Sequence, residues 1–106
     1  MIFLNDWEDS KLAGMIEDFD ISEKDLEGYQ ILLADYTYES YNGEAFVLLK
    51  KESDGTLYEV NGGHCSCYGL EGQWDLEETT VESIKHRITE GSLCVYKEYL
   101  TDLLIN

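Results

Sequence analysis

Three residues able to bind metal or act as nucleophiles gather in the middle of the sequence. His64, Cys65 and Cys67 lie in the stretch GGHCSCYG. Two thiolates there, joined by Cys94 and by either His64 or His86, would complete a tetrahedral zinc site. The spacing argues against it, because paired zinc cysteines usually have two or more residues between them, and no second such pair is present. We therefore expect Cys65 and Cys67 to be small core residues of a strand, with a metal-binding HCSC segment as the alternative.

The same side chains could form a nucleophilic cysteine–histidine pair, which requires a thiolate within hydrogen-bond reach of an imidazole. In an extended segment Cys65 and Cys67 face one side and His64 faces the other. His86 could approach only through the fold, and no third residue stands at a spacing that would orient the pair. The sequence therefore predicts no catalytic residue and no enzyme. It predicts instead that His64 hydrogen-bonds the glycine-rich backbone around it.

Carboxylates dominate the charged side chains of this chain. Its 106 residues include 23 acidic residues against 7 lysines and arginines, a net charge of −16. An excess this large costs the folded state self-repulsion. It also disfavours direct binding to DNA, RNA or an anionic membrane, since such binding rests on cationic contacts to phosphate. The composition favours a basic partner.

Two clusters are the predicted contact surface for that partner. The first holds six acidic residues within eleven positions, opposed only by Lys24: Glu17, Asp18, Asp20, Glu23, Asp25 and Glu27. The second follows the central stretch: Trp74, Asp75, Glu77 and Glu78. Carboxylates spread over a convex surface can imitate the phosphates of a nucleic acid and compete for the basic groove that holds it. Trp74 is either a core residue or an exposed anchor for the partner.

Turn and cap signals predict the elements that position these residues. The capping pattern Asn5–Glu8 and the apolar residues after it predict a helix at about 6–19, and Ser22–Asp25 repeats the capping pattern. Three β-rich runs follow, joined by turn signals: 29–39, 44–52 and 56–60, with turns at 41–43 and 53–55. This pattern is typical of a three-stranded antiparallel meander.

Alternation within the meander predicts which residues share a face. Four aliphatic residues are expected on one face: Ile31, Leu33, Val47 and Leu49. Tyr36 and Tyr38 are expected on the other face of the first strand.

Two helices are predicted after the meander. A capping box at Thr79–Glu82 begins the first, which Gly91 ends. The last helix begins at Ser92, with an extended segment at 92–97 as the alternative. The prediction is one α+β domain over residues 1–106, in the order α-β-β-β-α-α, with the helices on one face of the sheet.

The N-terminal run Met1–Leu4 is too short for a signal peptide and lacks a basic flank. No stretch approaches the roughly 20 apolar residues of a membrane span. Three cysteines in such a chain argue against a disulfide framework. We therefore expect a cytoplasmic protein.

The string GGHCSCYGLEGQWDLEE resembles a sequence found in small, mostly uncharacterised proteins of tailed phages and prophages, and the resemblance covers about residues 58–82. It implies a phage accessory protein that acts inside a bacterial host. As a group, small and very acidic phage proteins resemble inhibitors of host defence, including anti-CRISPR and anti-restriction proteins. We expect a protein, without a cofactor, that binds and inhibits a host nucleic-acid-binding protein by mimicking its nucleic acid.

Overall fold

A five-stranded sheet forms the middle layer of the fold, and the computed structural model describes residues 1–39, 42–65, 69–91 and 93–104. The strands follow one another across the sheet in chain order: β1 Ile2–Asn5, β2 Tyr29–Glu39, β3 Asn42–Lys51, β4 Leu57–His64 and β5 Glu77–Thr79. β1 pairs with β2 in parallel, and the other pairs are antiparallel. The α+β class and the β2–β3–β4 meander are confirmed.

The predicted turn at 53–55 is confirmed, with Gly55 at a φ of +76° and the Asp54 carboxylate accepting a hydrogen bond from the Thr56 amide at 2.9 Å. Of the predicted turn at 41–43, residues 42 and 43 belong to β3 instead, and residue 41 lies outside the described residues. β4 continues past the predicted end at residue 60, since Gly62 and Gly63 pair with Ala45 and Glu44 near the start of β3.

A β-bulge in β2 decides which residues share a face. Ile31 lies opposite Leu49, yet Leu33 lies opposite Leu48, so Leu32 is an extra residue in the strand. An extra residue reverses the facing of everything that follows it. Leu33 therefore packs on the opposite face from Ile31, whereas Tyr36 packs in the same core cluster as Ile31. The predicted facing of Leu33 and of the two tyrosines is wrong for this reason.

One face of the sheet is covered by α1 (Lys11–Phe19) and the short 3-10 helix η1 (Glu23–Leu26). The predicted helix start at residue 6 is wrong. Asn5 ends an unpredicted edge strand at a φ of +57°, and the residues from 6 to 10 form turns that lead to α1. The core on this face holds Trp7 and Phe19, each at most 1% exposed. The capping box of Ser22 and Asp25 is confirmed at the start of η1.

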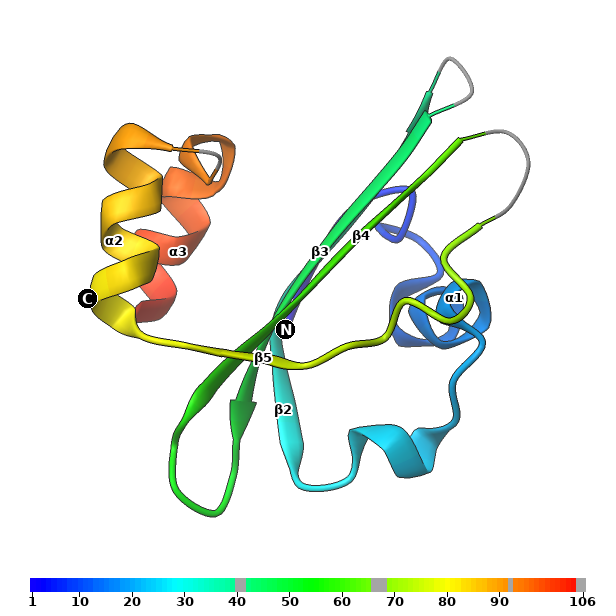
Figure 1. The fold of residues 1–106 in the computed structure, drawn as a ribbon, viewed down its shortest axis with the longest axis horizontal. Helices are drawn as coiled ribbons and strands as arrows, with labels where there is room; N and C mark the ends of the chain where they lie inside the picture. Colours follow the sequence, from blue (N-terminus) through cyan, green and yellow to red (C-terminus); the bar gives the residue numbers. More distant parts are fainter. Residues whose placement is uncertain (40–41, 66–68, 92, 105–106) are drawn as a thin grey trace.

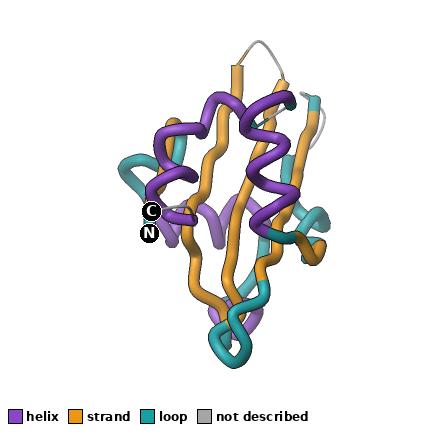
Figure 2. The backbone as a smooth tube through the Cα atoms, turned by 90° about the vertical axis from the view of Figure 1, so that its left-hand side faces the viewer, coloured by secondary structure: helices purple, strands orange, loops and turns teal. Residues whose placement is uncertain are grey.

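The other face is covered by α2 (Val81–Glu90), the 3-10 turn η2 (Cys94–Tyr96) and α3 (Lys97–Leu104). Figure 1 shows α2 and α3 on one side of the sheet and α1 on the other, and Figure 2 shows α2 and α3 in front of the strands. The end of α2 at Gly91 is confirmed, but the predicted capping box of Thr79 and Glu82 is off by one residue, since the Thr80 side chain is the cap and accepts from the Ser83 amide. Ser92, where the last helix was predicted to begin, lies outside the described residues. Over residues 93–104 there is neither one continuous helix nor an extended segment, because η2 precedes α3.

The prediction that all helices cover one face of the sheet is therefore wrong. Apolar residues of β2 and β3 point to both faces, so each face needs its own cover. The second core joins α2 and α3 to the sheet through Ile84, Leu100, Phe46 and Leu48. Within the described part of the chain, no helix is long and apolar enough to cross a membrane.

Candidate functional site

Negative charge is concentrated on the α1 face. Residues 1–28 hold nine acidic residues and two lysines, and residues 69–76 hold two acidic residues and no basic one. The segment 69–76 lies beside α1, because Leu70, Trp74 and Leu76 belong to the core on that face. By contrast, residues 81–104 of the opposite face hold four acidic and three basic residues. The two faces of the sheet therefore differ strongly in charge.

The first predicted cluster lies together on this face, on α1 and η1 and in the turns beside them. Four of its members are exposed and make no ion pair among the described residues: Glu17, Asp20, Glu23 and Glu27. The other two support local structure. Asp18 is half-buried and accepts a hydrogen bond from the Trp7 indole nitrogen at 2.7 Å. Asp25 is exposed, and its carboxylate accepts from the Ser22 amide at 2.9 Å.

The second predicted cluster does not form a single surface. Trp74 is half-buried and packs edge-on against Phe19, with ring centroids 5.0 Å apart, which fits the core interpretation. Its indole nitrogen is buried and has no hydrogen-bond acceptor among the described residues. Asp75 is exposed in the loop before β5. In β5, Glu78 lies opposite Tyr58 and Glu77 opposite Glu59, so these two neighbouring carboxylates point to different faces.

His64 is a structural residue at the end of β4. Its Nδ1 donates to the Cys65 carbonyl at 2.8 Å, and its Nε2 accepts from the Tyr36 hydroxyl at 2.5 Å. A methyl group at Gly43 would lie 2.2 Å from Nε2, so only glycine lets the ring pack there. The expectation that His64 bonds the surrounding backbone is confirmed. Burial, assisted by the charges of Asp18 and Asp6, raises the pKa of Tyr36 to about 12.

The candidate metal ligands are not brought together among the described residues. No group of three His, Cys, Asp or Glu side chains there could hold a metal ion, and Cys67 lies outside the described residues. Cys94 is in η2 and His86 on the outer side of α2, across the sheet from the His64 ring. Cys65 is exposed, so its interpretation as a core residue was wrong.

Two buried carboxylates on the α2 face were missed by the sequence analysis. Glu59 accepts two hydrogen bonds from the Arg87 guanidinium, at 2.7 and 2.9 Å, and a third from the Asn61 amide at 2.8 Å. Burial, the largest single influence, raises the pKa of Glu59, but these hydrogen bonds and the Arg87 charge together outweigh it and hold the pKa below its usual value. The pair ties β4 to α2.

The second missed carboxylate is Asp35, in the middle of β2. It accepts from the Asn5 side-chain amide at 2.6 Å and from the Tyr96 hydroxyl at 2.5 Å. Burial, together with this hydrogen bond and the charge of Asp35, raises the pKa of Tyr96 above its usual range. The sequence contains a signal for Asp35 and Glu59, because each acid interrupts an apolar run that otherwise has the pattern of a buried strand. Sequence alone cannot say what pairs with them.

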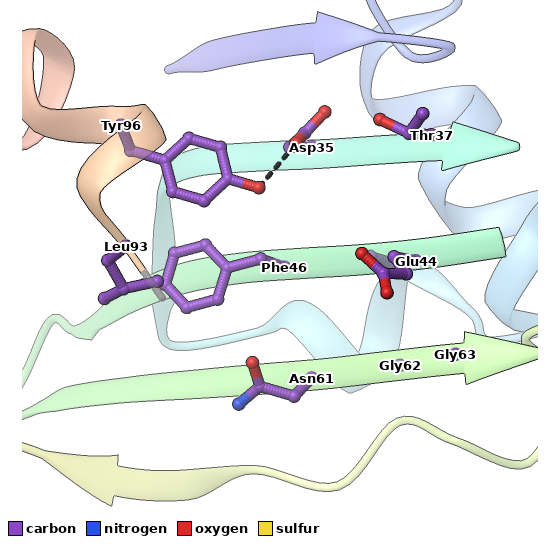
Figure 3. A pocket seen from close by; sticks show the side chains of 10 residues that line it. Asp35, Thr37, Glu44, Phe46, Asn61, Gly62, Gly63, Leu93 and Tyr96 are labelled. Atoms are coloured by element: carbon purple, nitrogen blue, oxygen red, sulfur yellow. Dashed lines mark hydrogen bonds between the residues drawn. The ribbon is translucent and has the colours of Figure 1, made fainter. Parts of the chain in front are cut away.

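A cavity of about 290 Å³ opens beside Asp35, on the face that α2 and α3 cover only in part. Figure 3 shows the side chains that define it, which come from β2, β3, β4 and η2: Asp35, Thr37, Glu44, Phe46, Asn61 and Tyr96. Phe46 and Tyr96 stack with ring centroids 5.4 Å apart and an interplanar angle of 16°. The cavity thus has an aromatic wall at one end and oxygen atoms at the other.

Comparison of the chain with protein-family models, with curated proteins and with solved structures finds no match. The function is therefore inferred from the residues of the chain and their arrangement. They offer two features: an acidic surface on the α1 face and an oxygen-lined cavity on the opposite face.

Proposed function

We propose that this protein binds the basic, nucleic-acid-binding surface of another protein through its α1 face and so competes with that protein's nucleic acid. The observation that carries the proposal is the unequal charge of the two faces: eleven acidic residues against two lysines over residues 1–28 and 69–76. A field of one sign over one face steers a partner of opposite charge into a defined orientation. A charge spread evenly for solubility would not need this asymmetry.

The construction of the face supports this role. Four of its carboxylates are exposed and held by no ion pair among the described residues: Glu17, Asp20, Glu23 and Glu27. α1 itself is anchored to the sheet by Met15 and Phe19, both almost fully buried. A preorganised surface loses less conformational entropy when it binds than a flexible acidic tail would.

The biological setting of the proposal is a bacterial cell containing a phage or prophage, with this chain as an inhibitor of the anti-CRISPR or anti-restriction type. Its support is the resemblance of residues 58–82 to small phage proteins. The proposed contact between the α1 face and a basic protein rests on charge and geometry, and it does not require a phage origin.

Two charge-reversed variants test the contact. One carries lysine at Glu17, Asp20 and Glu23, and the other carries lysine at Glu82, Glu90 and Glu98 on the α2 and α3 face. Both have the same net charge, and circular dichroism would confirm that both are folded. Each protein is immobilised and exposed to a bacterial lysate, and retained proteins are eluted with rising salt or with duplex DNA or RNA.

We expect the wild type and the second variant to retain the same basic protein, which salt and a nucleic acid release. The first variant should not retain it. Equal loss in both variants would show that only net charge matters, and retention insensitive to salt and to nucleic acid would refute the mimicry.

A further inference from the structure

Asp35 is a buried carboxylate without a cation beside it in the part of the chain that the structure describes. It is 7% exposed, and its two hydrogen-bond donors, the Asn5 amide and the Tyr96 hydroxyl, are neutral. Glu59 is similarly buried on the same face but has its own arginine. A buried carboxylate is costly unless a positive charge compensates it. The contrast points to a counter-ion for Asp35 from outside the protein.

The polar lining of the adjacent cavity consists mainly of acceptors. The Glu44 carboxylate is exposed in it. One of the two N–H groups of the Asn61 amide already donates to Glu59, and the Asn61 carbonyl oxygen can accept. The Tyr96 hydroxyl donates its hydrogen bond to Asp35, so its oxygen can only accept a further one. Among the described residues, no lysine, arginine or histidine lines the cavity. A ligand that fits must therefore donate hydrogen bonds and carry positive charge.

Strand register places the two carboxylates so that one cation can reach both. Asp35 lies opposite Phe46, and Glu44 lies opposite Thr37. Asp35 and Glu44 are thus diagonal neighbours on one face, where side chains start about 7–8 Å apart. A planar group with several N–H donors can bridge that separation, and Figure 3 shows Asp35 and Glu44 on neighbouring strands.

The remaining wall and the size of the cavity restrict the ligand further. Phe46, Leu93 and Tyr96 line one end with apolar surface, which suits an alkyl stem or the flat face of a delocalised cation. A volume of about 290 Å³ lies at the lower limit of small-molecule pockets, roughly 300 Å³. A metal ion would leave the aromatic wall unused, whereas a nucleotide would be too large and has the wrong charge.

We propose that this cavity binds a guanidinium group carried on a short alkyl chain, with Asp35 and Glu44 as its carboxylate partners and Phe46 and Tyr96 against its stem. Guanidinium offers five donors in a rigid plane and pairs with carboxylates through charge-assisted hydrogen bonds. The site lies on the opposite face of the sheet from the acidic α1 face, and it does not depend on the proposed function.

The probe is propylguanidinium, titrated into the ¹⁵N-labelled full chain and followed by the amide chemical shifts. Neutral propylurea, which has nearly the same shape, is the matched control ligand. We expect saturable shifts of residues around the cavity with propylguanidinium and none with propylurea. Nα-acetyl-arginine methylamide distinguishes the sources of the group: binding at least as tight indicates an arginine of a partner protein, and weaker binding indicates a free guanidino compound.

Glu44→Gln should weaken the binding of propylguanidinium about tenfold, the size of one charge-assisted hydrogen bond, and Asp35→Asn should weaken it at least as much. Glu98→Gln, an exposed change on α3, should have no effect. If Asp35→Asn does not fold, the exposed Glu44 decides the question. Equal binding of both ligands, equal effects of Glu44→Gln and Glu98→Gln, or displacement of the guanidinium by calcium would overturn the proposal.

Discussion

Replacing Arg87 with methionine should destabilise the protein by about 3 kcal/mol, at the lower end of the range for breaking a buried ion pair. The Glu59 side chain is 6% exposed and that of Arg87 27%. Methionine keeps the apolar contacts of the arginine stem but removes both arginine hydrogen bonds, so Glu59 keeps only neutral partners, Asn61 and Thr79. The partial exposure of Arg87 lets water replace some of the lost interaction, which places the loss at the lower end.

Replacing both partners should cost less than replacing Arg87 alone. In the double variant Glu59→Leu, Arg87→Met no charge is left buried, so we expect a free energy of unfolding within about 1 kcal/mol of the wild type. This comparison separates the net value of the ion pair from the cost of an unpaired carboxylate.

The effect of Arg87→Met should also depend on pH, with a defined sign. The folded-state pKa of Glu59 is lowered, so its contribution to stability is fully present above the unfolded pKa of about 4.3 and is lost as pH falls through the lower folded value. In the variant, burial without the arginine raises this pKa instead. The stability difference between the two proteins should therefore be constant above the raised pKa of Glu59 in the variant, and it should shrink as pH falls through that value and then through the lowered wild-type value.

Urea denaturation at several pH values measures these differences, with the slope m checked for equality. The control is His86→Ala on the same helix, since His86 faces solvent and its Nδ1 lies 3.7 Å from Oε2 of Glu90. An exposed contact of this kind should change stability by less than about 0.5 kcal/mol. If Arg87→Met is no worse than His86→Ala, or if its effect does not change with pH, the ion pair does not hold β4 to α2 as described.

Four further outcomes follow from the same contacts. Tyr36→Phe should lower the free energy of unfolding by about 1–2 kcal/mol, because it leaves the buried His64 nitrogen without its donor. In the wild type, an absorbance titration should show a tyrosine ionising near pH 12. The contribution of Tyr36 to stability should be complete below about pH 10 and lost as pH rises through the folded-state pKa. Gly43→Ala should lower thermal stability by about 1–3 kcal/mol through overpacking, and adding His64→Ala should recover part of this loss. Because both ring nitrogens of His64 are hydrogen-bonded, a chelator should leave the melting temperature unchanged in calorimetry; unfolding on chelation would instead support a metal site. Added salt should raise the melting temperature, since it screens the repulsion behind a net charge of −16.

The parts of the fold that could be predicted are those decided within a few residues. Asp54–Gly55 forces a tight turn, Thr80 caps α2 and Gly91 ends it. Such signals act through hydrogen bonds between backbone groups that are neighbours in the chain, so they can be recognised from the sequence alone. The meander and α2 were predicted close to their observed positions for this reason.

Long-range pairing decided what the sequence analysis had wrong. The capping pattern at Asn5 is a reasonable local signal for a helix, but the apolar run before it pairs with β2 and takes Asn5 into a strand. No residue in the apolar run of β2 indicates the bulge at Leu32, yet the bulge reverses the facing of every later residue of β2. Helices cover both faces because β2 and β3 carry apolar residues on each of them.

The acidic character of this protein, its α+β class and the exposure of most carboxylates in the first cluster were determined by the sequence itself, because charge and hydrophobic periodicity are properties of composition and order. Only the tertiary structure decided that α1 and residues 69–76 bring acids to one face. It also decided that Arg87 compensates Glu59 whereas Asp35 meets only neutral donors beside a cavity. Partners for a buried charge come from strands and helices distant in sequence, and the register that aligns them is a property of the assembled sheet.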